Sequence, residues 1–196
     1  MKQIKNLTLI AAMVFFANSS FAQMADSKMA DKKMENTVMV GGAAMYPTKN
    51  IVENAVNSKD HTTLVAAVKA AGLVETLQSA GPFTVFAPTN EAFKLLPAGT
   101  VDNLLKPENK TALTTVLTYH VVAGRISSKS LAEMIKAGNG KATLKTVAGG
   151  NLYVSMKGNK IVLTDEKGGI SVITIKDVNQ SNGVIHVVDH VLLPKM

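Results

Sequence analysis

In the first half of the part of the chain beyond residue 47, apolar residues recur at helical spacing. One such stretch begins near Asp60, a predicted N-cap, and ends at Gly72, a predicted C-cap. A second stretch covers residues 109–122 and places His120 on its buried face. Shorter helices are predicted over residues 50–58, 91–96 and 130–135.

Beyond residue 140 the period of the apolar residues changes to two, which is typical of strands. Turn signals rich in glycine separate these strands at Gly149-Gly150, Gly158-Asn159 and Gly168-Gly169. Helices followed by a strand meander, without βαβ alternation, predict an α+β domain with a mainly antiparallel sheet. The predicted strands are residues 83–86, 141–147, 152–156, 161–164, 170–175 and 184–193.

The chain begins with the pattern of an export signal. Lys2 and Lys5 precede an apolar run over residues 7–16, and small side chains follow at the positions that a signal peptidase reads, ending at Ala22. We therefore predict a signal peptide over residues 1–22 and a secreted or periplasmic protein. The apolar run has roughly half of the ~20 residues that a membrane-spanning helix needs, and no later segment is long and apolar enough.

Residues 23–47 are predicted to form a flexible linker rich in Met and Lys. Four of its methionines recur every five residues, a spacing that lines no single face of a helix or of a strand. One interpretation is a Cu(I) site, because thioether sulfur favours that ion. The other, which we prefer, is a tether whose composition cannot bury a core. The methionines are Met24, Met29, Met34 and Met39.

The composition indicates one folding unit and excludes one class of partner. The 196 residues and the apolar fraction of 46% suffice for a single core, and the chain has no cysteine for a disulfide. The net charge is +7, or +5 once Lys2 and Lys5 are removed, but Arg125 is the single arginine and aromatic residues are few. Because nucleic-acid recognition depends on arginine and on stacking, we do not expect a nucleic-acid partner.

The sequence offers no set of residues with the spacing of a catalytic or metal site. Nucleophile, phosphate-loop and calcium-loop motifs are missing from it. His186 and His190 lie four residues apart in a predicted strand, where about 13 Å along the strand keeps them from sharing one metal ion. His61, at a predicted helix start, is expected at the surface. We therefore predict a protein that is not an enzyme, with no cofactor and no metal.

Three segments, in this order, carry the most specific motifs: GPFTVFAPTNEAF at residues 81–93, LTYHVV at 117–122 and NGVIHVVDHVLLP at 182–194. Together they resemble the fasciclin-like domain family, and we assign residues 48–196 to this domain. The resemblance implies a compact α+β wedge in which several short helices pack on a mainly antiparallel β-sheet. It also implies a secreted or surface-anchored protein that acts in adhesion and matrix binding without catalysis.

The resemblance further implies candidate interaction residues. In matrix members of the family, integrin contact has been placed at two segments, the first of which corresponds to Tyr119 and His120. The second corresponds to Asp177 and Val178, an acidic and an aliphatic residue, although the neighbouring Glu-Pro of the family is absent. An export signal of bacterial type makes an animal receptor an unsuitable native partner. The resemblance therefore implies a binding surface on this chain and leaves its ligand open.

We expect a non-catalytic binding module for cell adhesion, most simply a monomer that contacts an extracellular or envelope protein or polysaccharide. The alternative is a carrier of a small apolar ligand, held in a cleft between the helices and the sheet. A concave apolar cavity of roughly a few hundred Å³ would favour this alternative.

Overall fold

Short helices fill the first half of the domain and strands fill the second half, as the change of apolar period predicts. The computed structural model describes residues 37–195, so the predicted signal peptide and residues 23–36 of the predicted linker lie outside the described residues. Within residues 37–195, no helix has the length and apolar character that crossing a bilayer requires. The α-helices and the 3-10 helices are α2 (Ile51–Ala55), η1 (Lys59–His61), α3 (Thr62–Ala71), α4 (Val74–Gln78), α5 (Asn90–Lys94), α6 (Thr100–Leu104), η2 (Pro107–Asn109), α7 (Lys110–Tyr119) and α8 (Ser128–Ala137).

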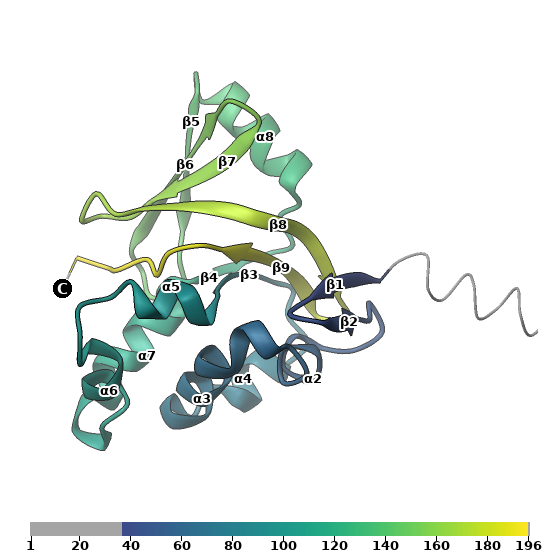
Figure 1. The fold of residues 1–196 in the computed structure, drawn as a ribbon. Coiled ribbons are helices and arrows are strands. Elements are labelled where there is room, and N and C mark those ends of the chain that lie inside the picture. Colours follow the sequence, from purple (N-terminus) through teal and green to yellow (C-terminus); the bar gives the residue numbers. More distant parts are fainter. Residues whose placement is uncertain (1–36, 196) are drawn as a thin grey trace, which may run out of the picture. The chain divides into compact units, whose positions relative to one another are not determined.

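The strands are β1 (Val38–Val40), β2 (Ala43–Met45), β3 (Phe83–Pro88), β4 (Val121–Ala123), β5 (Lys141–Lys145), β6 (Asn151–Lys157), β7 (Lys160–Thr164), β8 (Ile170–Gln180) and β9 (Gly183–Val188). Strands β3 to β9 form the main sheet in the order β4-β3-β9-β8-β7-β6-β5, and β1 pairs with β2 in a separate hairpin (Figure 1). Neighbouring strands are antiparallel except β3 and β9, which run parallel. The predicted α+β class with a mainly antiparallel sheet is therefore confirmed.

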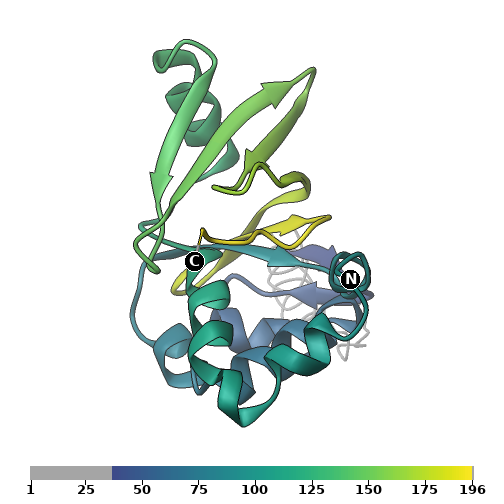
Figure 2. The same cartoon turned by 90° about the vertical axis from the view of Figure 1, so that its left-hand side faces the viewer.

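The main sheet bends so far that its two edge strands meet. Val122 of β4 forms an antiparallel bridge with Thr146, the residue that follows β5. The N–H of Val147 also donates a hydrogen bond to the carbonyl of Val121 over 2.8 Å. Figure 2 shows β5, β6 and β7 rising away from the layer of short helices, with α8 beside them. The contact shortens the exposed edge that an open sheet would have.

Central strands β3 and β9 separate two hydrophobic clusters. Val85 and Val187 face the cluster that also contains side chains of α2, α3 and α7. Phe86 and Val188 face the cluster formed with α8 and with β5, β6 and β7. Because both faces of β3 and β9 are covered, nearly all of their residues are buried, which explains their continuous apolar sequence.

Local sequence signals set several helix ends. Asn50 caps α2 with its side chain, and the Thr89 hydroxyl caps α5 by accepting from the N–H of Ala92 over 3.2 Å. Gly72 ends α3 in the left-handed region, at φ +74°, as predicted. The prediction that Asp60 caps α3 is wrong, because Asp60 lies within η1 and α3 begins without a side-chain cap.

The predicted linker extends too far toward the domain, because residues 38–45 form the hairpin of β1 and β2. Val40 and Met45 are buried in the cluster beneath the short helices. Gly41, which reads as a soft junction in the sequence, is a turn residue at φ +57°. A Cβ atom there would lie 2.4 Å from the Ser58 hydroxyl, so the close approach also requires glycine. The folded domain therefore includes this hairpin.

Candidate functional site

Helix α7 ends at two residues that the sequence singles out, Tyr119 and His120. His120 is 3% exposed, and its Nδ1 lies 2.8 Å from the Val116 carbonyl. Its Nε2 accepts from the N–H of Leu192 over 3.0 Å. This pattern fits a neutral ring protonated at Nδ1. Burial lowers the pKa of His120 to about 4, although the Val116 carbonyl and the Asp165 charge oppose that shift.

Tyr119 is fully buried and also holds distant segments together. Its hydroxyl donates to the Asn151 carbonyl over 2.7 Å and accepts from the N–H of Glu166 over 3.2 Å. Gly150 packs so closely on its ring that a Cβ atom there would lie 2.7 Å from a ring carbon. Burial raises the pKa of Tyr119 to about 12, so the hydroxyl stays protonated at neutral pH.

Asp177 lies at an irregularity of strand β8, where the pairing register with β9 shifts, and its φ is +59°. Its carboxylate accepts from the N–H of Ser128 over 2.7 Å and from the Ser128 hydroxyl, at the first residue of α8. Negative charge at a helix N-terminus is stabilising. The next residue, Val178, is 1% exposed and belongs to the core.

The four candidate interaction residues therefore have structural contacts. Tyr119 and His120 hold the C-terminal segment and the start of β6, whereas Asp177 holds the start of α8. Three of the four side chains are buried, so a partner could not touch them in this conformation. Recognition through this region stays a prediction.

His61 is buried, and its predicted surface position is wrong. The ring is 3% exposed because η1 turns it inward, and its Nδ1 lies 2.9 Å from the Ser58 hydroxyl. Its Nε2 has no partner at ordinary hydrogen-bond geometry within residues 37–195, although the main chain of Ala87 lies close enough to the ring to act on it as a weak acceptor. Burial lowers the pKa of His61, while this main-chain interaction with Ala87 and the charge of Asp60 oppose the shift.

A cavity of about 80 Å³ adjoins His61, between the short helices and the sheet. Its walls are almost wholly apolar and come from α2, α3, α4 and α7 on one side and from β3 and β9 on the other. Branched aliphatic side chains such as Leu64, Val68 and Ile185 dominate the lining. Sequence patterns place all of these residues in the core, and they give no signal that a space lies between them.

The other two histidines do not form a pair. His186 is fully buried, with its Nε2 2.9 Å from the Ile126 carbonyl and its Nδ1 accepting from the N–H of Asp177 over 3.2 Å. His190 lies beyond the end of β9 and pairs with Asp189 at the surface, so the predicted strand that would join them is wrong. In the part of the chain that the structure describes, no three His, Asp or Glu side chains gather to hold a metal ion.

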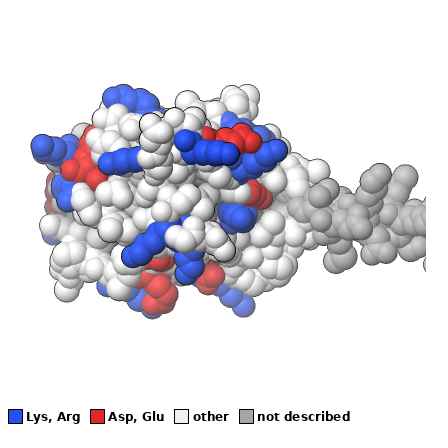
Figure 3. Space-filling model, turned by 90° about the horizontal axis from the view of Figure 1, so that it is seen from above, with Lys and Arg blue, Asp and Glu red and all other residues white. Residues whose placement is uncertain are grey.

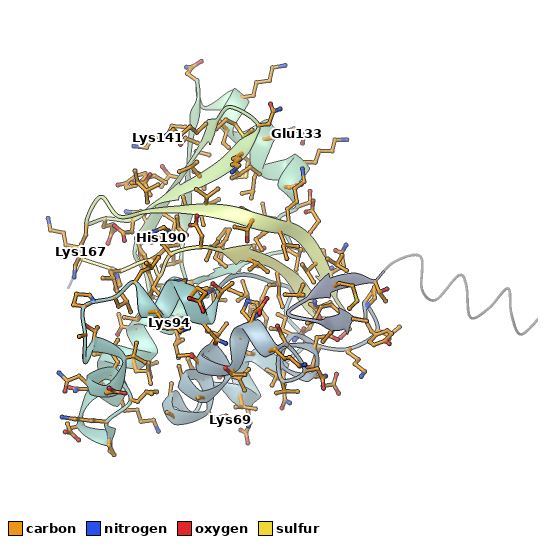
Figure 4. The ribbon with its side chains drawn as sticks, in the orientation of Figure 1. Lys69, Lys94, Glu133, Lys141, Lys167 and His190 are labelled. Atoms are coloured by element: carbon orange, nitrogen blue, oxygen red, sulfur yellow. The ribbon has the colours of Figure 1, made fainter. Side chains whose placement is uncertain are left out.

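Strands β5, β6 and β7 carry four lysines and no acidic residue. The exposed side chains are Lys141, Lys145, Lys157 and Lys160, and the Lys141 ammonium lies 4.3 Å from the ring centre of Tyr153 on the neighbouring strand. Figure 3 looks onto this end of the domain, where basic side chains are spread among fewer acidic ones. Figure 4 shows Lys141 at this end and Lys69, on α3, at the other.

The charge of the described residues is uneven. Residues 128–195 contain nine lysines and five acidic residues, a net charge of +4. Residues 37–127 contain seven basic and six acidic residues, a net charge of +1. The strand-rich half therefore carries most of the positive charge.

The sequence profile of the Fasciclin domain matches residues 59–194, more than half of the chain. The chain belongs to the fasciclin family. This finding confirms the family that the three motifs suggest.

Several relatives align with most of this fasciclin domain. "Protein sll1483" of Synechocystis is 47% identical over 162 residues, which cover 83% of each chain. The "Immunogenic protein MPB70" of Mycobacterium bovis is 37% identical over 145 residues, which cover 71% of this chain and 66% of the relative. Human "Periostin" is 33% identical over 135 residues, which cover 69% of this chain but only 15% of that longer protein.

A solved structure shows the same fold. The pair of FAS1 domains from the insect cell adhesion molecule Fasciclin I superposes with a TM-score of 0.67 at 18% identity. The match covers 76% of this chain and 52% of the insect chain. At this identity the likeness concerns the architecture of helices and bent sheet alone.

Proposed function

We propose that this fasciclin protein is an exported, non-catalytic binding module that attaches to acidic polysaccharide outside the cytoplasm. The observation that carries the proposal is the outer surface of β5, β6 and β7, with four exposed lysines and no acidic residue on these strands. We call these three strands the basic face. The pattern of an export signal over residues 1–22 supports a place outside the cytoplasm.

The chemistry of the basic face suits sugar carboxylates. Lysine acts as a compact, hydrated point charge, whereas the bidentate recognition of phosphate and guanine relies on arginine, and the chain has only Arg125. Tyr153 adds a half-buried aromatic ring opposite Thr143, between Lys141 and Lys145 of the neighbouring strand β5. Glu166, whose charge lies near Lys145, limits the face at one side.

The comparisons support a role in adhesion for this family. The insect structure comes from a cell adhesion molecule. For this chain we extend that role to attachment as a single module. A monomer is the simplest form of such a module.

The carriage of a small apolar molecule is the second candidate function. The cavity beside His61 has the apolar walls and the position between helices and sheet that a carrier needs, but its volume of about 80 Å³ is below the few hundred Å³ expected of such a site. The basic face and the cavity are formed by different residues, so the two functions can be tested separately.

Affinity electrophoresis through gels that contain alginate, a polymer of uronic acids, tests the first proposal. Replacing Lys141, Lys157 and Lys160 together by Gln is expected to weaken retardation about tenfold at low salt, as the loss of three exposed ion pairs of roughly 0.5 kcal/mol each implies. Added salt should weaken binding of the unaltered protein, because exposed charges are screened.

The matched control replaces Lys59, Lys94 and Lys106, which are exposed lysines of the helical half, by Gln. This variant has the same net charge and is expected to bind alginate within about twofold of the unaltered protein, because its lysines are distant from the basic face in sequence and fold. Equal losses in the two variants would show that only net charge matters and would contradict the assigned face. Binding to acidic proteins but not to alginate would redirect the proposal to a protein partner.

A further inference from the structure

We propose that a sugar ring of the acidic polysaccharide packs on the aromatic ring of Tyr153, and that Lys141 pairs with the carboxylate of the same sugar. The inference rests on the proposed attachment to polysaccharide and adds the residues that distinguish a sugar acid from any other polyanion. Lysines alone do not make that distinction, because exposed positive charges attract carboxylates of every kind.

Tyr153 lies in the middle of a row of side chains that crosses the basic face. On strand β6 it pairs with Thr143 of β5 and with Thr164 of β7, and Thr164 pairs in turn with Ile170 of β8. Thr143 and Ile170 are exposed, and Tyr153 and Thr164 are half-buried. The row therefore offers an aromatic ring, aliphatic carbon atoms and two hydroxyl groups to a partner.

The row is on the outer side of the sheet. The neighbouring residues Leu152, Val154 and Leu163 are buried in the cluster that also contains Leu131 of α8. Because side chains alternate along a strand, Tyr153 points away from this cluster. A tyrosine has an apolar body and a polar tip, which suits contact with a sugar, whose ring carries both C–H and O–H groups.

The charges around Tyr153 are unequal on its two sides. The ammonium of Lys141 lies 4.3 Å from the ring centre, and Lys157 and Lys160 lie beyond it in the same direction along the strands. On the other side, the carboxylate of Glu166 accepts from the main-chain N–H at the start of β6 over 2.9 Å. A sugar carboxylate is therefore attracted to the side of Lys141. An exposed cation–π contact is weak, so Lys141 can leave the ring to pair with that carboxylate.

Tyr46 provides a comparison within the same chain. It is also half-buried, and the ammonium of Lys49 lies 5.1 Å from the centre of its ring. Tyr46 follows β2 and so lies outside the basic face. A tyrosine with a lysine over its ring thus occurs twice, and only Tyr153 lies among the lysines of the basic face.

The test compares alginate with polyacrylate, a polymer that carries carboxylates but no sugar ring. Affinity electrophoresis of the full chain through gels that contain each polymer gives two dissociation constants. We expect Tyr153→Ala to raise their ratio, alginate over polyacrylate, about fivefold, as the burial of roughly 40 Å² of apolar ring surface implies. The rise should persist in added salt, because a ring contact is not screened as exposed charges are.

Tyr46→Ala is the matched control, because it makes the same change at the tyrosine outside the basic face. This variant is expected to leave the ratio unchanged. The amide spectrum of each variant checks that it remains folded. If Y153A does not fold, Tyr153→Leu keeps an apolar side chain in the strand without a flat ring, and the ratio is expected to rise about threefold.

A double variant tests whether one sugar contacts both residues. Groups that act on the same ligand unit have coupled effects, so Y153A should weaken alginate binding less in the presence of Lys141→Gln, by about twofold instead of about fivefold. The same pair of changes is expected to show no coupling in the binding of polyacrylate. Equal losses in both backgrounds would mean that Lys141 does not pair with the sugar that Tyr153 contacts.

The adverse results have distinct meanings. An unchanged ratio in folded Y153A, or an equal rise in Y46A, would overturn the ring contact while leaving attachment through charge intact. If alginate does not retard the unaltered protein at all, the proposed attachment is wrong and the inference fails with it.

Discussion

Two buried histidines at helix ends show how differently one residue type can serve the same fold. His120 follows α7 and His61 precedes α3, each is 3% exposed, and burial lowers the pKa of each ring. Both ring nitrogens of His120 have main-chain partners at normal hydrogen-bond distance, whereas the Nδ1 of His61 has a side-chain partner, Ser58. His61 also lies beside the apolar cavity. Equal burial therefore does not imply an equal role.

The partners also differ in their distance along the chain. His120 joins α7 to Leu192, 72 residues later, and so fixes the C-terminal segment against the helix. The Nδ1 of His61 joins Ser58, which lies only three residues earlier. Loss of the His120 ring should therefore affect tertiary structure, and loss of the His61 ring should affect a local contact and the cavity.

The largest expected effect comes from the same substitution at the two sites. His120→Phe leaves the N–H of Leu192 and the carbonyl of Val116 without the ring, which should lower the free energy of unfolding by about 3 kcal/mol. His61→Phe removes one hydrogen bond to Ser58 and should lower it by less than about 1 kcal/mol. Urea unfolding at pH 7 measures both. Equal costs would break the comparison.

Acid should remove most of the difference in the free energy of unfolding between the unaltered protein and H120F, because it destabilises only the protein that has the His120 ring. His120 has a pKa of about 4 when folded and about 6.5 when unfolded, so between these pH values the unfolded chain binds a proton that the folded chain does not. The contribution of His120 to the free energy of unfolding is fully present above pH 6.5 and falls by about 3 kcal/mol as the pH drops to 4.

This pH dependence can be assigned to individual residues. The pKa values of His61 and His186 are also lowered by burial, so the unaltered protein loses stability through all three rings. Urea unfolding of the unaltered protein and of H120F at pH 7 and pH 4.5 isolates the share of His120. NMR can follow the titration of the His120 ring directly. If the ring titrated near pH 6.5, His120 would not be buried in the folded protein in solution.

A smaller effect should come from Tyr119, the neighbour of His120. Tyr119→Phe keeps the buried ring and removes the hydroxyl that contacts Asn151 and Glu166. We expect a loss of about 1 to 2 kcal/mol in the free energy of unfolding, because the Asn151 carbonyl loses its donor. Tyr153→Phe, at a half-exposed tyrosine, is the matched control and should cost less than about 0.5 kcal/mol.

The smallest effect should come from the partner of His61. Ser58→Ala removes the hydroxyl at Nδ1 and is expected to cost about 0.5 to 1 kcal/mol in urea unfolding. A cost as large as that of H120F would mean that the Ser58–His61 pair supports the fold as His120 does.

The sequence predicts the parts of the fold that depend on local signals. Gly72 ends α3, Thr89 begins α5, and the period of two identifies the strands after residue 140. Strand ends were less predictable: β8 continues past its predicted end because the irregularity at Asp177 keeps it paired with β9. Such pairing is a tertiary effect that the apolar period does not encode.

The candidate site was harder to predict because burial depends on distant segments. The family resemblance makes Tyr119, His120 and Val178 candidate interaction residues, yet the C-terminal segment and the sheet cover them. For His120 the helical spacing already predicts a buried position. His61 reads as an exposed residue at a helix start, yet η1 turns it inward. The hairpin of β1 and β2 reads as linker because its glycines are those of a turn. No local pattern reveals a cavity between residues that are all apolar.

The most direct test of the comparison is a set of ¹⁵N NMR spectra of the histidine ring nitrogens, recorded between pH 7 and pH 5. We predict that His120 stays mostly neutral at pH 5 and keeps its proton on Nδ1, because both ring nitrogens have main-chain partners and burial lowers its pKa to about 4. A His120 ring that is charged at pH 5, or that carries its proton on Nε2 at pH 7, would contradict this role.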